Sequence, residues 1–202
     1  MIQPCSRVCA IAALVLLSAC SAAAGPISYL VTVDTSSVNG NSGFLDFQFN
    51  SDPTSQAASA AISSFNAVGG TLGAGPLPGP LTFTIPGNND NFQPFTYGTS
   101  FSFVLSLSGP ALSSPDGTGL GIIFGLGLYD GTLTAILTDQ GSGFAGTVEV
   151  NSDGTTTATG FPIGSSVVSF QPIGATTTPE PGTTLLMGFG TAGLLMLRKI
   201  LR

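Results

Sequence analysis

An all-β fold is predicted by three features of the sequence. Short segments alternate apolar and polar residues, Asn-Gly or Asp-Gly pairs stand between several of them, and the long body carries no convincing amphipathic helix. We expect an antiparallel β-sandwich ectodomain, jelly-roll-like or immunoglobulin-like, because short strands with Gly and Asp turns are typical of that class. Apolar segments at the two ends add an N-terminal signal helix and a single C-terminal transmembrane helix.

The clearest predicted strand is SFSFVLSLS, residues 100–108, in which apolar and serine side chains fall on opposite faces. The same alternation or β-branched content predicts strands at 29–34, 43–50, 81–87, 121–130, 132–139, 144–151, 155–161 and 165–171. Residues 55–65 fit a strand or a short helix equally well. Residues 69–80, GGTLGAGPLPGP, are too rich in Gly and Pro for regular structure and are expected to form a loop.

Tight turns are expected at Asn39-Gly40, Asp116-Gly117, Asp130-Gly131 and Asp153-Gly154, because Asn, Asp and Gly tolerate positive φ. Asp130-Gly131 in particular predicts a hairpin between the strands that flank it. The apolar faces of the strands predict a core made of Leu45, Phe47, Phe49, Phe83, Phe101, Phe103, Leu105, Leu107, Phe124, Leu126, Leu128 and Val148.

Four segments follow from these patterns. We expect a signal peptide over 1–24, the sandwich over 25–173, a Thr/Pro linker over 174–182, and a membrane helix with a basic tail over 183–202. The sandwich segment is long enough for one domain with its own core.

The distribution of charge excludes one class of partner. The net charge is −6, and the basic residues are confined to the two ends, at Arg7, Arg198, Lys199 and Arg202. Nucleic-acid binding requires cationic side chains against the phosphates, so we expect none.

The N-terminus fits export by signal peptidase. Arg7 precedes an apolar run from Val8 to Leu17 that is too short to span a bilayer, and small residues before Gly25 fit a cleavage site. LSAC, ending at Cys20, also resembles a lipobox, so lipidation of Cys20 stays open beside cleavage near Ala24. After cleavage near Ala24 the mature chain would contain no cysteine.

The C-terminus fits a membrane anchor. Thr183 to Leu197 is apolar apart from its Thr and Gly residues, and Ile200 with Leu201 brings the segment close to a full span. The basic cluster Arg198, Lys199 and Arg202 would then stay on the cytoplasmic side.

Pro179, Glu180 and Pro181, followed by this apolar span and the basic cluster, resemble the PEP-CTERM sorting signal, a module also labelled an ice-binding protein C-terminal domain. The resemblance implies a surface protein of a Gram-negative, polysaccharide-producing bacterium. It implies processing by a membrane-embedded exosortase, hence an inner-membrane intermediate before the cell surface or the extracellular space. Segments of the body, including FGLGLYD, resemble a group of such proteins that has no assigned biochemical activity.

The body lacks the residues of common active sites. Between Gly25 and Thr178 there is no His, Lys or Cys, so the usual nucleophile–base pairs and zinc sites cannot be built, and we expect no enzymatic activity. A glycan hydrolase would need paired carboxylates, but Glu149 alternates with valines and is expected on the outer face of a strand.

Binding of a cofactor or ligand is less restricted. Calcium is the one cofactor left open, through weak candidates at Asp116 and Asp153, where turn-forming Asp is the simpler explanation. Tyr29, Tyr97 and Tyr129 are candidates for a sugar platform, and Ser/Thr-rich outer faces for contact with polysaccharide or ice.

These expectations combine into a non-catalytic surface protein with a structural or adhesive role in the extracellular polysaccharide matrix or biofilm. Exopolysaccharide is then the expected partner besides the processing enzymes. The alternative is a carbohydrate- or ice-binding module on the cell surface.

Overall fold

The computed structural model describes residues 25–85, 89–117, 121–138 and 141–174, which belong to a compact unit over Gly25–Ala175. In these ranges no helix combines the length and apolarity needed to cross a membrane. The predicted signal helix, the membrane helix and all but the first residue of the linker lie outside the described residues.

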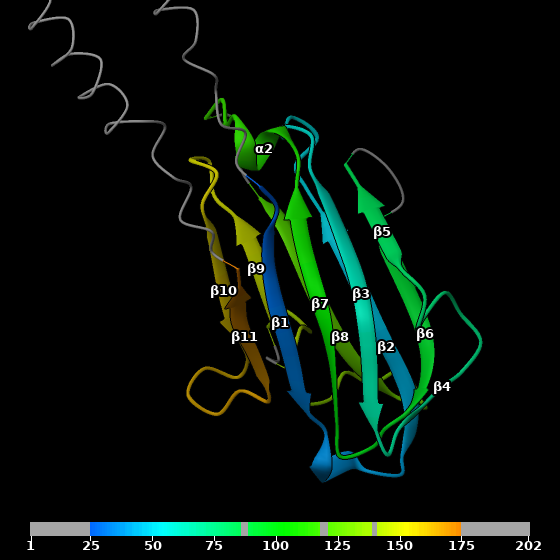
Figure 1. The fold of residues 1–202 in the computed structure, drawn as a ribbon. Coiled ribbons are helices and arrows are strands. Elements are labelled where there is room, and N and C mark those ends of the chain that lie inside the picture. The colour runs from blue at the N-terminus through cyan, green and yellow to red at the C-terminus, as the bar shows by residue number, and fades with distance from the viewer. Residues whose placement is uncertain (1–24, 86–88, 118–120, 139–140, 175–202) are drawn as a thin grey trace, which may run out of the picture. The chain divides into compact units, whose positions relative to one another are not determined.

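Two antiparallel sheets form the described fold, and Figure 1 shows them as two layers. Sheet A has the order β11 (Val168–Ile173), β1 (Ile27–Asp34), β7 (Ser100–Ser108), β3 (Ser59–Val68) and β5 (Leu81–Thr84). Sheet B has the order β10 (Thr156–Gly160), β9 (Gly146–Val150), β8 (Ile122–Asp130), β2 (Ser42–Asn50), β6 (Asp90–Thr96) and β4 (Thr71–Leu72). Two short helical turns, η1 (Ser36–Val38) and α2 (Pro110–Ser113), connect strands.

The chain changes sheet at every step from β1 to β8, so the strand pairs are nested. β1 pairs with β7, β2 with β6, and β3 with β5, all antiparallel. Only β8, β9 and β10 follow one another in the same sheet. This winding makes β2 a central strand of sheet B, paired with β8 on one side and β6 on the other.

The core lies between the inner faces of the two sheets. Every residue of the predicted core is buried, at most 2% exposed, which confirms the period-two alternation used to predict it. Phe103 of sheet A joins the two layers, because its ring lies 5.4 Å from that of Phe47 and 6.3 Å from that of Phe124, both in sheet B. The edge-to-face contact with Phe47 adds to the area-dependent stabilisation.

One predicted strand is wrong. Residues 132–139 form no strand over their described part, and only Ala135 makes an isolated bridge, to Tyr129. The Asp130 carboxylate explains this, because its Oδ1 accepts the N–H groups of Thr132 and Thr134 at 2.8 and 2.9 Å and holds a wide turn. Leu133 and Leu137 have positive φ, which ends the alternation.

Two strands escaped the sequence analysis, and one open alternative is resolved. β6 contains Pro94, which is tolerated because its backbone faces β4, a strand of only two residues at the sheet edge. β4 itself lies within the expected loop of residues 69–80. The segment over 55–65, open between helix and strand, contributes to β3.

Phe103→Ala should lower the free energy of unfolding by about 3–5 kcal/mol, because it removes a buried ring that contacts both sheets and leaves a cavity. Urea denaturation followed by circular dichroism measures the change. Ser102→Ala, on the outer face of the same strand, is the matched control and should stay within about 0.5 kcal/mol of the wild type. A loss below about 1 kcal/mol for Phe103→Ala would contradict the packing described.

Candidate functional site

The outer face of sheet B carries an unusual cluster of aromatic rings. Phe44 of β2, Phe92 of β6 and Tyr129 of β8 lie on adjacent strands, and we call these three residues the aromatic platform. The rings of Phe44 and Phe92 stack at 4.7 Å, and those of Phe92 and Tyr129 lie 5.5 Å apart at a tilt. Phe92 is 43% exposed, so the platform faces solvent. None of the three strands that carry it is an edge strand of sheet B.

A row of polar side chains runs along β2 beside the platform. Asn50 donates to Gln48 Oε1 at 2.9 Å, and Gln48 donates to Asp46 Oδ2 at 2.6 Å. Asp46 pairs in register with Phe92 on one side and with Gly127 on the other. We call Asp46, Gln48 and Asn50 the polar row; it places a carboxylate and two amides next to the exposed rings.

Asp46 is the most unusual member of this row, because only 5% of it is exposed. Burial raises the pKa of its carboxyl group, the hydrogen bond from Gln48 opposes this effect, and the charge of Asp90 adds to it. The body between Gly25 and Thr178 contains no Lys or Arg. A nearly buried acid without a cationic partner costs stability, and strand propensity does not require one.

Two glycines make room for the rings above the sheet. A Cβ atom at Gly127 would lie 2.9 Å from Tyr129 Cε2, and one at Gly125 would lie 2.6 Å from Phe144 Cε1. Both glycines face outward on β8, opposite Asp46 and Gln48 respectively. The edge of the Tyr129 ring therefore lies over Gly127 beside the polar row, and the ring of Phe144 lies over Gly125, two residues earlier on β8.

Tyr97 fixes the strands that carry the platform. Its hydroxyl oxygen lies 2.8 Å from the carbonyl oxygen of Phe44 and 2.9 Å from that of Tyr129, and it accepts the N–H of Tyr129 at 3.2 Å. The side chain is fully buried, and burial raises the pKa of its phenol. Position 43 of β2 must be glycine, because a Cβ atom at that position would overlap the carbonyl oxygen of Tyr129.

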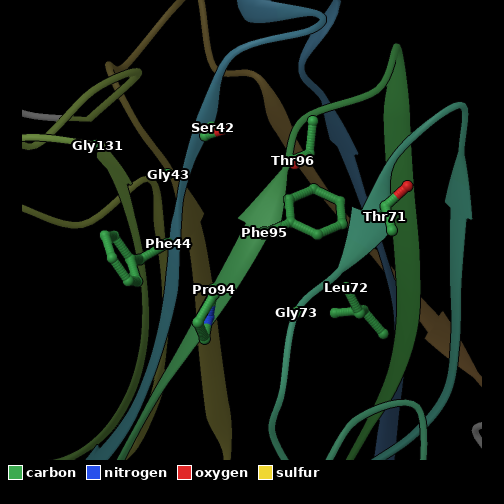
Figure 2. Close-up of a pocket in the computed structure, with 10 residues that line it drawn as sticks. All are labelled: Ser42, Gly43, Phe44, Thr71, Leu72, Gly73, Pro94, Phe95, Thr96 and Gly131. Carbon is green, nitrogen blue, oxygen red and sulfur yellow. The ribbon is translucent and has the colours of Figure 1, made fainter.

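A pocket of about 400 Å³ adjoins the platform at Phe44. Figure 2 shows it between β2, β6 and β4, with Phe44, Pro94, Phe95 and Leu72 among its walls. Its remaining lining residues are Ser, Thr and Gly, so no ionisable side chain lines it.

The calcium candidates Asp116 and Asp153 belong to neighbouring turns, since a Cβ atom at Gly154 would touch Pro115 and the carbonyl oxygen of Leu112. The Oδ1 atom of Asp153 is already engaged, because it accepts the N–H and the hydroxyl of Thr155. These bonds lower the pKa of the Asp153 carboxyl. Within the described ranges, no group of three or more His, Cys, Asp or Glu side chains is placed to hold a metal ion.

The other candidates are separated. Glu149 is exposed on the outer face of β9, as its alternation with valines predicted. The prediction of a sugar platform is wrong for two of its three tyrosines, since Tyr29 and Tyr97 are buried in the core. Of the three, Tyr129 alone lies on the outer face. Cys20, the triplet Pro179, Glu180 and Pro181, and the cluster Arg198, Lys199 and Arg202 lie outside the described residues.

Sequence reasoning missed most of the platform although a signal was present. Phe44 and Phe92 stand at polar positions of their strands, and Gly125 and Gly127 repeat at period two within an otherwise apolar strand. Glycine inside a strand often marks the close approach of another group. Here that group is an aromatic ring.

Comparison with known proteins assigns the C-terminal segment. Residues 177–200 match the family model described as the PEP-CTERM protein-sorting motif, as the resemblance of Pro179, Glu180, Pro181 and the basic cluster predicted. The motif implies export and membrane-anchored sorting to the cell surface, with an exosortase as the processing enzyme. No curated protein and no solved structure matches the chain.

Tyr97→Phe should destabilise the fold by about 1–3 kcal/mol, because it keeps the ring and leaves buried backbone groups of Phe44 and Tyr129 without their partner. Chemical denaturation measures the change. Tyr29→Phe is the matched control, since it removes one bond, to the hydroxyl of Thr156, and should cost less. Equal losses in the two variants would contradict the special role of Tyr97.

Asp46→Asn should be more stable than the wild type at pH 7, and the difference should shrink as the pH falls toward 3. The folded pKa of Asp46 is raised above its unfolded value, so the stability linked to its protonation is fully present below the unfolded pKa and is lost as the pH rises through the folded pKa. Unfolding free energies at several pH values measure this. The control is Glu149→Gln, which makes the corresponding change from acid to amide at an exposed position. An Asp46→Asn variant that is less stable than the wild type at pH 7 would refute the assigned burial cost.

Proposed function

We propose that this chain is an exported protein, processed by an exosortase, with a non-catalytic structural or adhesive role in the extracellular polysaccharide matrix or biofilm of a Gram-negative bacterium. The single observation that carries the proposal is the PEP-CTERM motif at residues 177–200. In the route we propose, signal peptidase acts at the N-terminus, and the apolar segment from Thr183 holds the chain in the inner membrane. The exosortase then acts on the C-terminal motif.

The residue content of the body supports a role without catalysis. The body contains no His, Lys or Cys, so a nucleophile would have no usual base beside it. Four aspartate side chains in turns accept hydrogen bonds from backbone groups of their own loops. Asp34, Asp52, Asp130 and Asp153 each accept the N–H of the residue two positions later.

A second candidate function, a carbohydrate-binding module, is favoured by the aromatic platform. Exposed rings beside hydrogen-bonding side chains are the usual composition of small-ligand sites. An adhesive matrix protein and a carbohydrate-binding module are compatible, since binding to polysaccharide is one way in which a surface protein is held in a matrix.

Deletion of residues 179–202 should release the protein into the culture medium, because it removes the sorting motif and the predicted membrane segment together. Immunoblots of membrane, surface and medium fractions measure the distribution. Cys20→Ala in the full-length and truncated chains is the control for a lipid anchor.

The outcomes of this experiment are distinct. Release by truncation alone supports anchoring through the C-terminus. Retention of the truncated chain with release after Cys20→Ala would place the anchor at the N-terminal lipid instead. Retention of the truncated chain with and without Cys20→Ala would contradict the anchoring proposal.

A further inference from the structure

The aromatic platform and Asp46 form an arrangement that folding does not explain. Burial of a carboxylate on the outer face of a sheet costs stability, and no cationic side chain of the body is available to offset that cost. Phe92 remains 43% exposed above it, and a large exposed ring beside polar groups is typical of a binding surface. A ligand that covers the ring and donates hydrogen bonds to the carboxylate would account for both features.

We propose that the outer face of sheet B binds a non-acidic saccharide, neutral or amino-bearing, with one sugar ring stacked on Phe92 and Tyr129 and its hydroxyl or amino groups bonded to Asp46 and Gln48. The proposal deepens the adhesive role and rests on it for its biological context. It assigns a ligand class and a binding site to the body of the protein.

The chemistry of the site selects this ligand class. The apolar C–H face of a pyranose matches an exposed aromatic ring, and sugar hydroxyls both donate and accept. Asp46 supplies acceptors, and the described residues give its Oδ1 no hydrogen-bond donor. Gln48 and Asn50 supply amide groups that can donate or accept.

The charges of the site exclude the competing classes. Nucleic-acid bases also stack on aromatic rings, but their phosphates require Lys or Arg, and the body has none. Acidic polysaccharides would meet Asp46 and Asp90, which both belong to this part of sheet B. A lysine peptide would satisfy the charges, but its flexible side chains offer no flat apolar face to cover Phe92 and Tyr129, which lie 5.5 Å apart.

The platform continues into a site for a second sugar unit. Phe44 stacks on Phe92 and also lines the pocket of about 400 Å³ between β2, β6 and β4. The pocket wall contains hydroxyls of Ser42, Thr71 and Thr96 and no ionisable group. A linear oligosaccharide can therefore extend from Asp46 past Phe44 toward β4, which makes oligomers the expected ligands.

The experiment measures binding to three defined hexasaccharides and one peptide. The probes are a β-1,4-glucose hexamer, a β-1,4-glucosamine hexamer, a galacturonic acid hexamer and a hexalysine peptide. Full-length protein in a polyoxyethylene detergent, which carries no sugar, is titrated by calorimetry. We expect binding to one or both of the first two probes, at least tenfold tighter than to the galacturonic acid hexamer.

Variants then place the binding on the platform. Phe92→Ala should weaken binding at least tenfold, and Phe92→Leu, which keeps apolar bulk without a flat ring, should weaken it as well. Phe92→Trp should retain binding, and it introduces a tryptophan into a chain that has none, so the ligand should change its fluorescence. Thr32→Ala, on the exposed outer face of sheet A, is the control and should bind as the wild type does.

Each alternative result overturns the proposal. These results are no binding of the first two probes, equal or tighter binding of the galacturonic acid hexamer, binding of hexalysine alone, and unchanged binding in both Phe92→Ala and Phe92→Leu. Circular dichroism of every variant checks folding, and chromatography of the recovered probe checks for hydrolysis. Cell fractionation measures sorting independently of binding. The proposal of a saccharide site can therefore be contradicted while the proposal of a sorted surface protein is supported.

Discussion

The buried hydroxyl of Tyr97 is the contact on which the outer face of sheet B depends. It bonds to backbone groups of Phe44 and Tyr129, so it fixes the ends of β2 and β8 relative to each other. The approach is close enough to require glycine at position 43. Two residues of the aromatic platform are therefore held through their backbones, which leaves their side chains free to face solvent at set positions. Rigid support of this kind is what a binding surface needs, since less order has to be gained when a ligand arrives.

The two sheets of the sandwich are alike on their inner side and different on their outer side. Both inner faces supply an apolar core, but their outer faces differ in chemistry. Sheet A presents small hydroxyl side chains such as those of Ser102 and Ser106, whereas sheet B presents rings, amides and a nearly buried carboxylate. The stability that the core provides allows sheet B to hold Asp46 at a cost. Asp46 thus lowers the stability of the fold and is also part of the proposed saccharide site.

The fold class and the core could be predicted because both follow from period-two alternation, which is local in the sequence. The strand predictions failed where a local hydrogen bond or a proline outweighs the alternation of apolar and polar residues. The side chain of Asp130 accepts hydrogen bonds that fix the turn after β8 and prevent a strand at 132–139. Pro94 makes β6 difficult to predict, because its place between β2 and β4 depends on partners distant in the sequence. The platform was largely missed for a different reason. Phe44, Phe92 and Tyr129 lie on three strands far apart in the chain, and only the nested pairing of those strands brings their rings together.

The confinement of positive charge to the ends has a practical consequence for the protein outside the cell. Trypsin-like proteases cut after Lys or Arg, and between Arg7 and Arg198 they find neither. The whole sandwich is therefore one uncut product for such enzymes, whether folded or not. A surface protein of this composition resists that class of protease because its body lacks the recognition residue, and the body would also yield no useful peptides in a standard tryptic survey of surface proteins.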